Sequence, residues 1–283
     1  MGDGRDGRSG GDDRDGRGGW VLAVDVANGL TRLGVFDGDE LQGSWEVSTP
    51  RHVTADEARE QVRDVLGRIA TTAFRKDVAV ADARPRGAIL SCVVPTHAEA
   101  WMRALASFSD SRPVVVGPGL RTGLRMRLEN PGDVGSDRIA NVVAARETVG
   151  APVLVVSLGT TTNIEVVDDT GAFVGGAIAP GVMLGARALD EAAARLPLVE
   201  LQVPRRAIGR NTREAIQVGV VLGEAARVDG LLDIIAEELG YVAPVVVTGH
   251  HAAVVAPLLR HEVSLDEQLT LRGLALIWGR LHA

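Results

Sequence analysis

The sequence predicts an α/β fold in which one structural unit occurs twice. The first observation is the segment 153–181, where apolar runs at residues 153–156, 164–167 and 173–178 are separated by polar turns. The second is a similar segment nearer the amino end, where an apolar run at 20–25 leads into a polar turn and another run at 33–36. Short apolar runs bounded by turn residues are typical of consecutive strands. The two segments begin about 130 residues apart, near a domain length, so we interpret them as the first hairpins of two similar domains.

Both first turns contain residues that suit a phosphate group. The later turn can offer backbone N–H groups and hydroxyls without a bulky side chain, from Gly159, Thr160 and Thr161. The earlier strand ends at Asp25, and Asn28 follows in its turn. A carboxylate there can hold Mg²⁺ beside a phosphate in transfer. Two domains that face such turns across a cleft describe the duplicated actin-like fold of sugar kinases, actin and heat-shock ATPases. Each turn taken alone could equally be structural.

Length and composition limit the class of protein. The 283 residues suffice for two domains, and the net charge of -7 argues against a nucleic-acid-binding surface. Cys92 is the only cysteine, so an intrachain disulfide is excluded and a reducing compartment fits. No apolar stretch reaches the roughly 18 residues that span a bilayer. We expect a soluble cytoplasmic protein that binds neither nucleic acid nor membrane.

The chain divides into a tail and two predicted domains. Residues 1–19 are mostly Gly, Asp and Arg, which predicts a disordered tail. Residues 20–118 form the expected first actin-like domain and residues 119–283 the second. Within the second, we interpret residues 119–150 as a linking segment that carries the substrate and base motif.

Further elements follow in order along the chain. Thr54 and Glu57 form a capping box before a helical pattern at residues 58–69. Strands are predicted at 87–92, 113–116 and 244–247, and helices after residue 137, over 184–196 and along 216–235. In the last of these, Gly219 and Gly223 suggest close packing against another backbone. Strands that alternate with helices imply mixed or parallel sheets covered by helices.

Two features near predicted helix starts leave their role open. Asp137 and Arg138 fall in a first helical turn, where an Asp interacts favourably with the helix dipole. An Asp next to a cleft could equally accept a proton from a substrate hydroxyl. His250 and His251 could suggest a metal, but adjacent helical residues face different directions. We favour surface histidines.

Taken together, the motifs resemble those of the type III pantothenate kinases in order and spacing, from residue 20 to the end of the chain. They are Asp25-Val26-Ala27-Asn28, Gly117-Pro118-Gly119, Thr122-Gly123, Asn130-Pro131, Gly135-Ser136-Asp137-Arg138, Gly159-Thr160, Gly175-Gly176-Ala177-Ile178-Ala179-Pro180-Gly181, Leu196-Pro197 and Gly209-Arg210-Asn211-Thr212.

The resemblance implies an ATP-dependent kinase that usually forms homodimers. Such enzymes phosphorylate the primary hydroxyl of pantothenate, the first step of coenzyme A biosynthesis, and use Mg²⁺. Carried over to this sequence, the resemblance makes Asp137 the general base and places Asp25 at the phosphates and Mg²⁺. The remaining implied contacts are Asn28, Gly159, Thr160 and Thr161 for ATP, and Thr122, Gly123, Gly135 and Arg138 for pantothenate.

Several positions depart from the family pattern. In the first turn, Ala27 and Gly29 replace a Gly and a hydroxyl residue. In the second, the family's Asp, Ala, Thr and Asp are replaced by Ser157, Thr161, Asn163 and Glu165. Two further changes are His250 in place of a Gly and Leu128 in place of a Tyr.

The change at Ser157 affects a cation. The family generally needs K⁺ or NH₄⁺, held in part by the carboxylate that Ser157 replaces. We therefore interpret Ser157 as a degenerate monovalent-cation position and expect little K⁺ dependence. Two alternatives stay open: a kinase of the same fold for another small hydroxylated substrate, and a catalytically degenerate paralogue acting as a ligand-binding regulatory protein.

Overall fold

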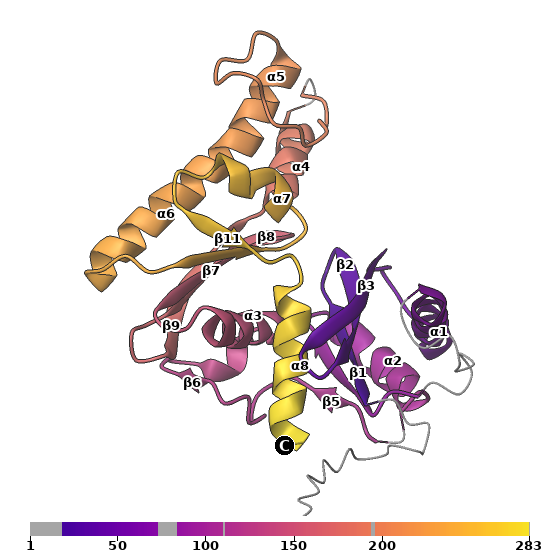
Figure 1. Cartoon of the computed structure of the whole chain (residues 1–283). Coiled ribbons are helices and arrows are strands. Elements are labelled where there is room, and N and C mark those ends of the chain that lie inside the picture. Colours follow the sequence, from indigo (N-terminus) through magenta and orange to yellow (C-terminus); the bar gives the residue numbers. More distant parts are fainter. Residues whose placement is uncertain (1–18, 73–83, 110, 194–195, 283) are drawn as a thin grey trace, which may run out of the picture.

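Two β-sheets with helices on both sides form the protein, seen in a computed structural model that describes residues 19–72, 84–109, 111–193 and 196–282 (Figure 1). The disordered tail predicted for residues 1–19 lies, apart from Gly19, outside the described residues. None of the described helices has the length and apolar character that crossing a bilayer requires.

The first sheet has the strand order β3-β2-β1-β4-β5. Strands β1, β2 and β3 pair antiparallel, whereas β4 and β5 extend the sheet in parallel from β1. The strands are β1 (Trp20–Val26), β2 (Leu30–Asp37), β3 (Glu40–Ser48), β4 (Gly87–Cys92) and β5 (Val114–Val115).

The second sheet repeats this arrangement. Its order is β11-β10-β7-β8-β9-β6, in which β7, β8 and β9 pair antiparallel and β10 and β11 continue in parallel. Apart from β6 at one edge, it matches the first sheet strand for strand, so the predicted duplication is confirmed. The strands are β6 (Arg125–Met126), β7 (Val153–Leu158), β8 (Thr161–Val167), β9 (Ala172–Pro180), β10 (Val245–Thr248) and β11 (Val263–Leu265).

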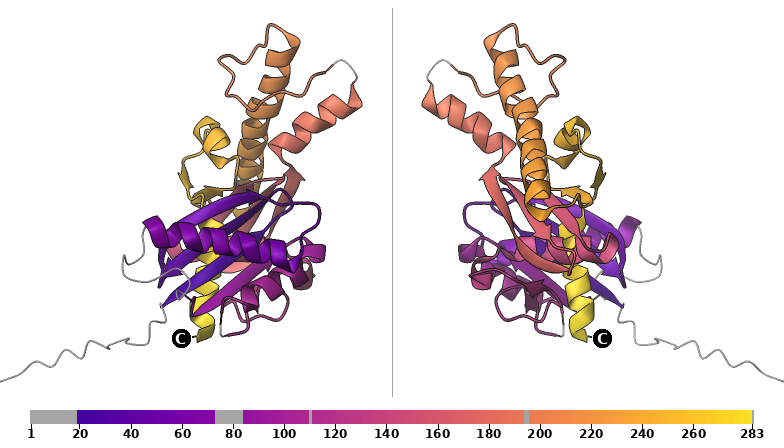
Figure 2. Two further views of the ribbon diagram at one scale, coloured as in Figure 1. Left: turned by 90° about the vertical axis from the view of Figure 1, so that its right-hand side faces the viewer. Right: turned by 90° about the vertical axis from the view of Figure 1, so that its left-hand side faces the viewer.

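The helices form three layers: an outer layer on each sheet and an inner layer between the two sheets (Figures 1 and 2). Side chains alternate along β1, so that Leu22 and Val24 pack in the outer core while Val21 and Ala23 pack in the inner one. The outer helices of the first sheet are α1 (Ala55–Thr72) and α2 (Pro95–Ala106). Between the sheets lie α3 (Ser136–Thr148) and α8 (Leu269–His282). The far side of the second sheet carries α4 (Val182–Ala192), α5 (Thr212–Gln217), α6 (Gly223–Leu239) and α7 (Ala252–Val255).

Helix α8 was not predicted, and it affects the domain division. It packs on α3 so closely that a Cβ on Gly273 would collide with the Ala140 carbonyl oxygen. Its buried side chains, among them Leu274 and Trp278, share a core with Val21 and Ile89 of the first sheet. Although residues 119–283 were assigned to the second domain, this helix therefore packs on the first. The exact domain boundaries stay a prediction.

Local signals had mixed outcomes. The capping box is confirmed, because Thr54 N–H donates to Glu57 Oε2 (2.8 Å) and Glu57 N–H donates to Thr54 Oγ1 (3.2 Å). The expectation of close packing at Gly219 and Gly223 was wrong, since a Cβ at either would meet nothing within 4 Å. Instead, this stretch forms a π-helical turn, Val218–Leu222.

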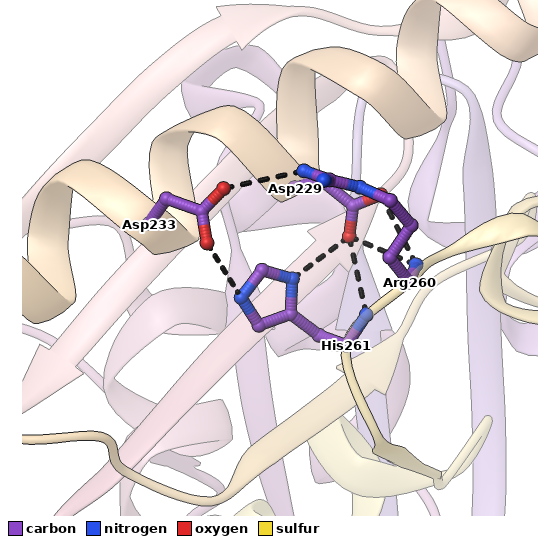
Figure 3. A network of polar contacts seen from close by, with 4 residues as sticks. All are labelled: Asp229, Asp233, Arg260 and His261. Carbon is purple, nitrogen blue, oxygen red and sulfur yellow. Dashed lines mark hydrogen bonds and ion pairs between the residues drawn. The ribbon is translucent and has the colours of Figure 1, made fainter.

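A group of ionic contacts, here called the α6 network, ties α6 to the segment before β11 (Figure 3). It consists of Asp229, Asp233, Arg260 and His261. Buried Asp229 accepts hydrogen bonds from the backbone N–H of Arg260 (3.0 Å) and contacts His261 Nδ1 (2.8 Å). Burial alone would raise the pKa of Asp229, but the hydrogen bonds from His261 and Arg260 together lower it. The α6 network therefore holds α6 against residues 260–261, which indicates a structural role.

Candidate active site

The first turns of the two sheets meet at a pocket of about 370 Å³. They approach closely, because a Cβ on Gly29 would lie 3.3 Å from Thr160 Oγ1. A third turn, at residues 249–251 after β10, also lines the pocket, as do α3, α4 and the start of α8. Gly249 has φ +99°, and its backbone lies against Leu158 O, to which His251 N–H donates (3.0 Å). The pocket therefore lies where the carboxyl ends of β1, β7 and β10 converge.

Most of the predicted site residues lie at this pocket. Its lining includes Asp25, Asn28, Asp137, Ser157, Gly159, Thr160 and Thr161. These residues come from the end of β1 and its turn, from the start of α3, and from the β7–β8 hairpin, and the fold brings them together.

Two carboxylates lie within the pocket, that of buried Asp25 and that of half-buried Asp137. Burial raises the pKa of Asp25 to about 7, the charge of Asp137 adds to this, and Ser91 and Arg32 oppose it. Oδ1 of Asp25 is buried and has no hydrogen-bond partner in the described structure. Burial also raises the pKa of Asp137, against a hydrogen bond from the Arg138 backbone N–H to Asp137 Oδ1 (2.8 Å). Such perturbed acids in a cleft are typical of functional sites.

Comparison with known proteins decides the family. The family model for type III pantothenate kinases matches residues 21–234. A type III pantothenate kinase of Thermomicrobium roseum is 40% identical over 262 residues, which are 93% of this chain and 98% of that protein. One of Frankia alni is 41% identical over 264 residues, covering 92% of this chain and 99% of that protein. The chain belongs to the type III pantothenate kinase family.

Solved structures agree on the fold. The ethanolamine utilization protein EutJ of Carboxydothermus hydrogenoformans has a TM-score of 0.55 at 17% identity, covering 91% of this chain and 89% of that one. The ROK hexokinase of Thermus thermophilus has a TM-score of 0.50 at 15% identity, covering 93% and 99%. These likenesses bear on the fold alone. With the repeated sheet order, they confirm the duplicated actin-like fold.

The predicted pantothenate contacts of this family member separate into two groups. Gly135 and Arg138 flank Asp137, and a Cβ on Gly135 would lie 2.5 Å from Asp137 Oδ1. Thr122 and Gly123 lie elsewhere, and none of these four residues is part of the pocket lining. The carbonyl oxygens of Thr122 and Gly123 accept hydrogen bonds from Arg280 Nη1 (3.1 Å) and Arg146 Nη2 (2.9 Å), which holds this loop against α8 and α3.

Sequence reasoning missed a cation in the pocket, Arg32 on β2. It is buried, and its Nε donates to Glu46 Oε1 on β3 (2.7 Å). Oε2 of Glu46 lies 3.5 Å from His250 Nδ1, in the third turn. Glu46 therefore connects Arg32 of the first sheet to the turn that follows β10 of the second sheet. The available signal was a lone Arg in a stretch, Leu30–Asp37, that is mostly apolar.

Glu165 was read from the sequence as a departure from the family, yet it retains a carboxylate. It is fully buried on β8, and its Oε1 accepts a hydrogen bond from Arg138 Nε (2.9 Å). Burial raises the pKa of Glu165 to about 7, although the charge of Arg138 lowers it. Glu165 thus anchors the arginine that follows Asp137.

The pocket also has oxygen atoms that suit cations. In the described ranges, no group of three or more His, Cys, Asp or Glu side chains could hold a metal on protein ligands alone. Mg²⁺ in kinases is usually held by one or two carboxylates together with substrate phosphates and water. Asp25, with its unpartnered oxygen and Asp137 nearby, fits that requirement. The oxygens beside Ser157 that could bind a cation are neutral. The register partners of Ser157 are Asn163 and Thr248, whose Oδ1 and Oγ1 are buried and have no hydrogen-bond partner.

Proposed function

We propose that this chain phosphorylates the primary hydroxyl of pantothenate with ATP, in the pocket between the two sheets. The carrying observation is that, in a member of this family, half-buried Asp137 lines the same pocket as buried Asp25, where the two turns meet. Asn28, Gly159, Thr160 and Thr161 would hold the ATP phosphates. In such a transfer, positioning and charge stabilisation matter more than covalent chemistry.

Asp137 is the proposed general base. One of its oxygens accepts the Arg138 backbone N–H, which leaves the other free to accept the proton of the substrate hydroxyl. The raised pKa caused by burial makes this carboxylate a stronger base than an exposed Asp. Glu165 holds the Arg138 side chain in place next to the base. We propose that pantothenate, once bound, contacts Arg138 and Gly135 as well as the loop of Thr122 and Gly123, although the pocket lining itself includes none of these residues.

Asp25 and Arg32 are proposed to handle the phosphate charge. Asp25 would hold Mg²⁺, which neutralises charge on the ATP phosphates. Arg32 lines the pocket and is oriented by Glu46, so its guanidinium is available to phosphate oxygens.

Assembly and location belong to the same proposal. Exposed large apolar side chains lie on α4 and the following segment: Leu184, Leu189, Leu198, Val203 and Ile208. A face of this kind supports a homodimer, which sedimentation would test. Coenzyme A synthesis fits a cytoplasmic enzyme, and fractionation of cells that produce the chain would test this location.

The experiment is to measure ADP release and phosphorylated product with ATP, Mg²⁺ and pantothenate. The matched control is an analogue of pantothenate that lacks the primary hydroxyl. We expect product only with pantothenate. Transfer to another alcohol would instead favour a kinase of different specificity, and absence of ATP binding would favour a regulatory protein.

A further inference from the structure

The residue that follows the β7–β8 turn (residues 159–161) is bound from the side opposite the pocket. Along β8, Thr161 and Asn163 line the pocket, whereas Thr162 between them does not and is 1% exposed. Successive side chains of a strand point to opposite faces of the sheet. The Thr162 hydroxyl accordingly faces α6, where it donates a hydrogen bond to Glu224 Oε1 (2.5 Å). The turn that lines the pocket is therefore continuous with a contact made behind it.

Glu224 reaches a second strand through Arg227. It lies in the first turn of α6, is 4% exposed, and its Oε2 pairs with Arg227 Nη2. The same nitrogen donates to the carbonyl oxygen of Pro180, the last residue of β9. Pro180 is in turn the register partner of Thr161. Glu224 and Arg227 thus hold both β8 and β9 next to the turn.

The end of β9 also supports the backbone of the turn directly. The N–H of Gly181, which follows Pro180, donates to Thr160 O (3.1 Å). A Cβ on Gly181 would collide with the carbonyl oxygen of Gly159, so the two backbone segments are in contact. Because Arg227 holds Pro180, loss of that hydrogen bond would loosen the turn as well as the strand.

The burial of this ion pair indicates a positional role. Both oxygens of Glu224 are occupied by protein donors, and Glu224 is not part of the pocket lining. Buried ion pairs often add little net stability compared with apolar side chains of similar volume. A π-helical turn, Val218–Leu222, ends where α6 begins, and such turns are frequent at functional sites. What the pair contributes is therefore the geometry of the strands that it holds.

We propose that Glu224 and Arg227 are positioning residues for ATP, which hold the β7–β8 turn in the conformation that receives the phosphates. This inference rests on the proposed phosphate-binding role of Gly159, Thr160 and Thr161. A turn that is already ordered loses less conformational freedom when a phosphate binds. Breaking the pair should therefore weaken ATP binding and leave pantothenate binding unchanged.

The test compares Glu224→Gln and Thr162→Val with Thr162→Ser and Asp229→Asn. Glu224→Gln removes the charge that pairs with Arg227, and Thr162→Val removes the hydroxyl at nearly the same side-chain size. Thr162→Ser keeps the hydroxyl. Asp229→Asn is the matched control, because Asp229 is a second buried acid of α6 and its arginine partner, Arg260, precedes β11. Thermal unfolding first establishes a temperature at which every variant is folded.

Glu224→Gln and Thr162→Val should raise the Kd for ATP, measured by calorimetry, by roughly ten-fold or more, as when the partner that orients a binding residue is lost. The KM for ATP should rise with it, while the KM for pantothenate stays parental. Thr162→Ser and Asp229→Asn should keep the parental Kd for ATP. The double variant Glu224→Gln/Thr162→Val should be affected less than the product of the single effects, because both break the same link. Equal rises in both KM values, or a Kd for ATP equal to that of Asp229→Asn, would overturn the proposal.

A second readout needs neither ATP nor turnover. Hydrogen exchange of the backbone amides at residues 159–162 reports how often the turn opens. In the protein without ligand, we expect faster exchange there in Glu224→Gln and Thr162→Val, and parental exchange in Asp229→Asn. If the parent binds ATP but phosphorylates nothing, and these shifts are seen, the proposed function fails while the positioning role stands. If turnover is normal in every variant and exchange is unchanged, the positioning role fails alone. A parent that binds no ATP would overturn both.

Discussion

Two aspartates in this molecule, Asp229 in the α6 network and Asp25 in the pocket, are both buried, but their carboxylates have opposite pKa shifts. In the α6 network, the Asp229 side chain is 3% exposed, has a hydrogen-bond donor for each oxygen, and has a lowered pKa. In the pocket, Asp25 is 4% exposed, has an unpartnered oxygen, and has a pKa raised to about 7. Partners rather than burial separate the two.

The difference indicates which cluster is structural and which one awaits a ligand. A buried carboxylate with its donors in place stabilises the folded state. A buried carboxylate without them destabilises it until a cation or another donor arrives. In the pocket, Mg²⁺ bound together with ATP would supply the partner that Asp25 Oδ1 lacks. In the α6 network, both oxygens of Asp229 already have a donor. Four predictions test this contrast, from the largest expected effect to the smallest.

The first prediction concerns turnover. Asp137→Asn should lower kcat by roughly 10²–10⁴-fold because the general base is lost, while the protein stays folded. Asp233→Asn, in the α6 network, is the matched control and should keep the parental kcat. Initial rates of ADP release with pantothenate measure both. An Asp137→Asn variant that works at the parental rate would remove Asp137 from the mechanism.

The second prediction concerns stability without ligand at pH 8. Asp229→Asn should destabilise by roughly 1–3 kcal/mol, because backbone and side-chain donors lose their charged acceptor. Asp25→Asn should cost nothing or raise the melting temperature, because it removes an unpartnered buried charge. Thermal unfolding of both variants measures this. A large drop for Asp25→Asn with activity intact would make Asp25 a structural residue and erase the contrast.

The third prediction is the pH dependence of that stability. Asp25 has a folded pKa of about 7 against an ordinary value of 3.8. A carboxyl group with a raised folded pKa contributes stability below its unfolded pKa, and this is lost as the pH rises through the folded pKa. The protein without ligand should therefore lose stability between pH 3.8 and about 7, and Asp25→Asn should reduce that loss. Glu165, whose pKa is also raised to about 7, and Asp137, whose pKa burial also raises, contribute to the same loss.

Asp229 supplies the opposite sign for the same experiment. Its folded pKa is lowered, so its contribution is present above the unfolded pKa and lost as the pH falls through the folded value. Asp229→Asn should flatten the acid side of the stability curve and leave the neutral side unchanged. Urea unfolding across the pH range measures both variants. Identical slopes for Asp25→Asn and the parent would show that Asp25 is not the titrating group.

Local patterns predicted much of the fold and the centre of the site, because strands, turns and caps depend mainly on residues that are neighbours in the sequence. The turns at Asp25 and Gly159 are of this kind, and the duplication placed them face to face. Helix α8 was not predicted, although its apolar residues Leu271, Leu274, Ile277 and Trp278 recur at helical spacing. Arg32 and Glu46 are cross-strand partners in one hairpin, but the contact of Glu46 with His250 joins distant segments, and no local signal contains it. Thr122 and Gly123 were assigned from a motif alone, and tertiary contacts with Arg280 and Arg146 decide where they lie.

The smallest expected effect concerns the monovalent cation. It would sharpen the contrast by adding a third carboxylate to the pocket, at position 157, where the neighbouring oxygens have no hydrogen-bond partner. Ser157 lies in the pocket lining between Asn163 and Thr248, and the unpartnered oxygens of these neighbours carry no charge. Next to an ion, replacing a full charge by a dipole removes a few kcal/mol of attraction at an effective dielectric constant near 20. We therefore expect the unmodified enzyme to be largely independent of K⁺.

Ser157→Asp should introduce a K⁺ response, because it places a carboxylate among neutral oxygens that can complete the coordination of the ion. Ser157→Asn is the matched control, since it has a similar size but no charge, and it should stay unresponsive. Initial rates are measured while KCl is titrated against an inert-cation salt at fixed ionic strength, so that screening is constant. A many-fold K⁺ activation of the unmodified enzyme would show that neutral oxygens suffice to hold the ion. In that case the unpartnered Asn163 and Thr248 oxygens would be its ligands, and the missing charge at Ser157 would not matter.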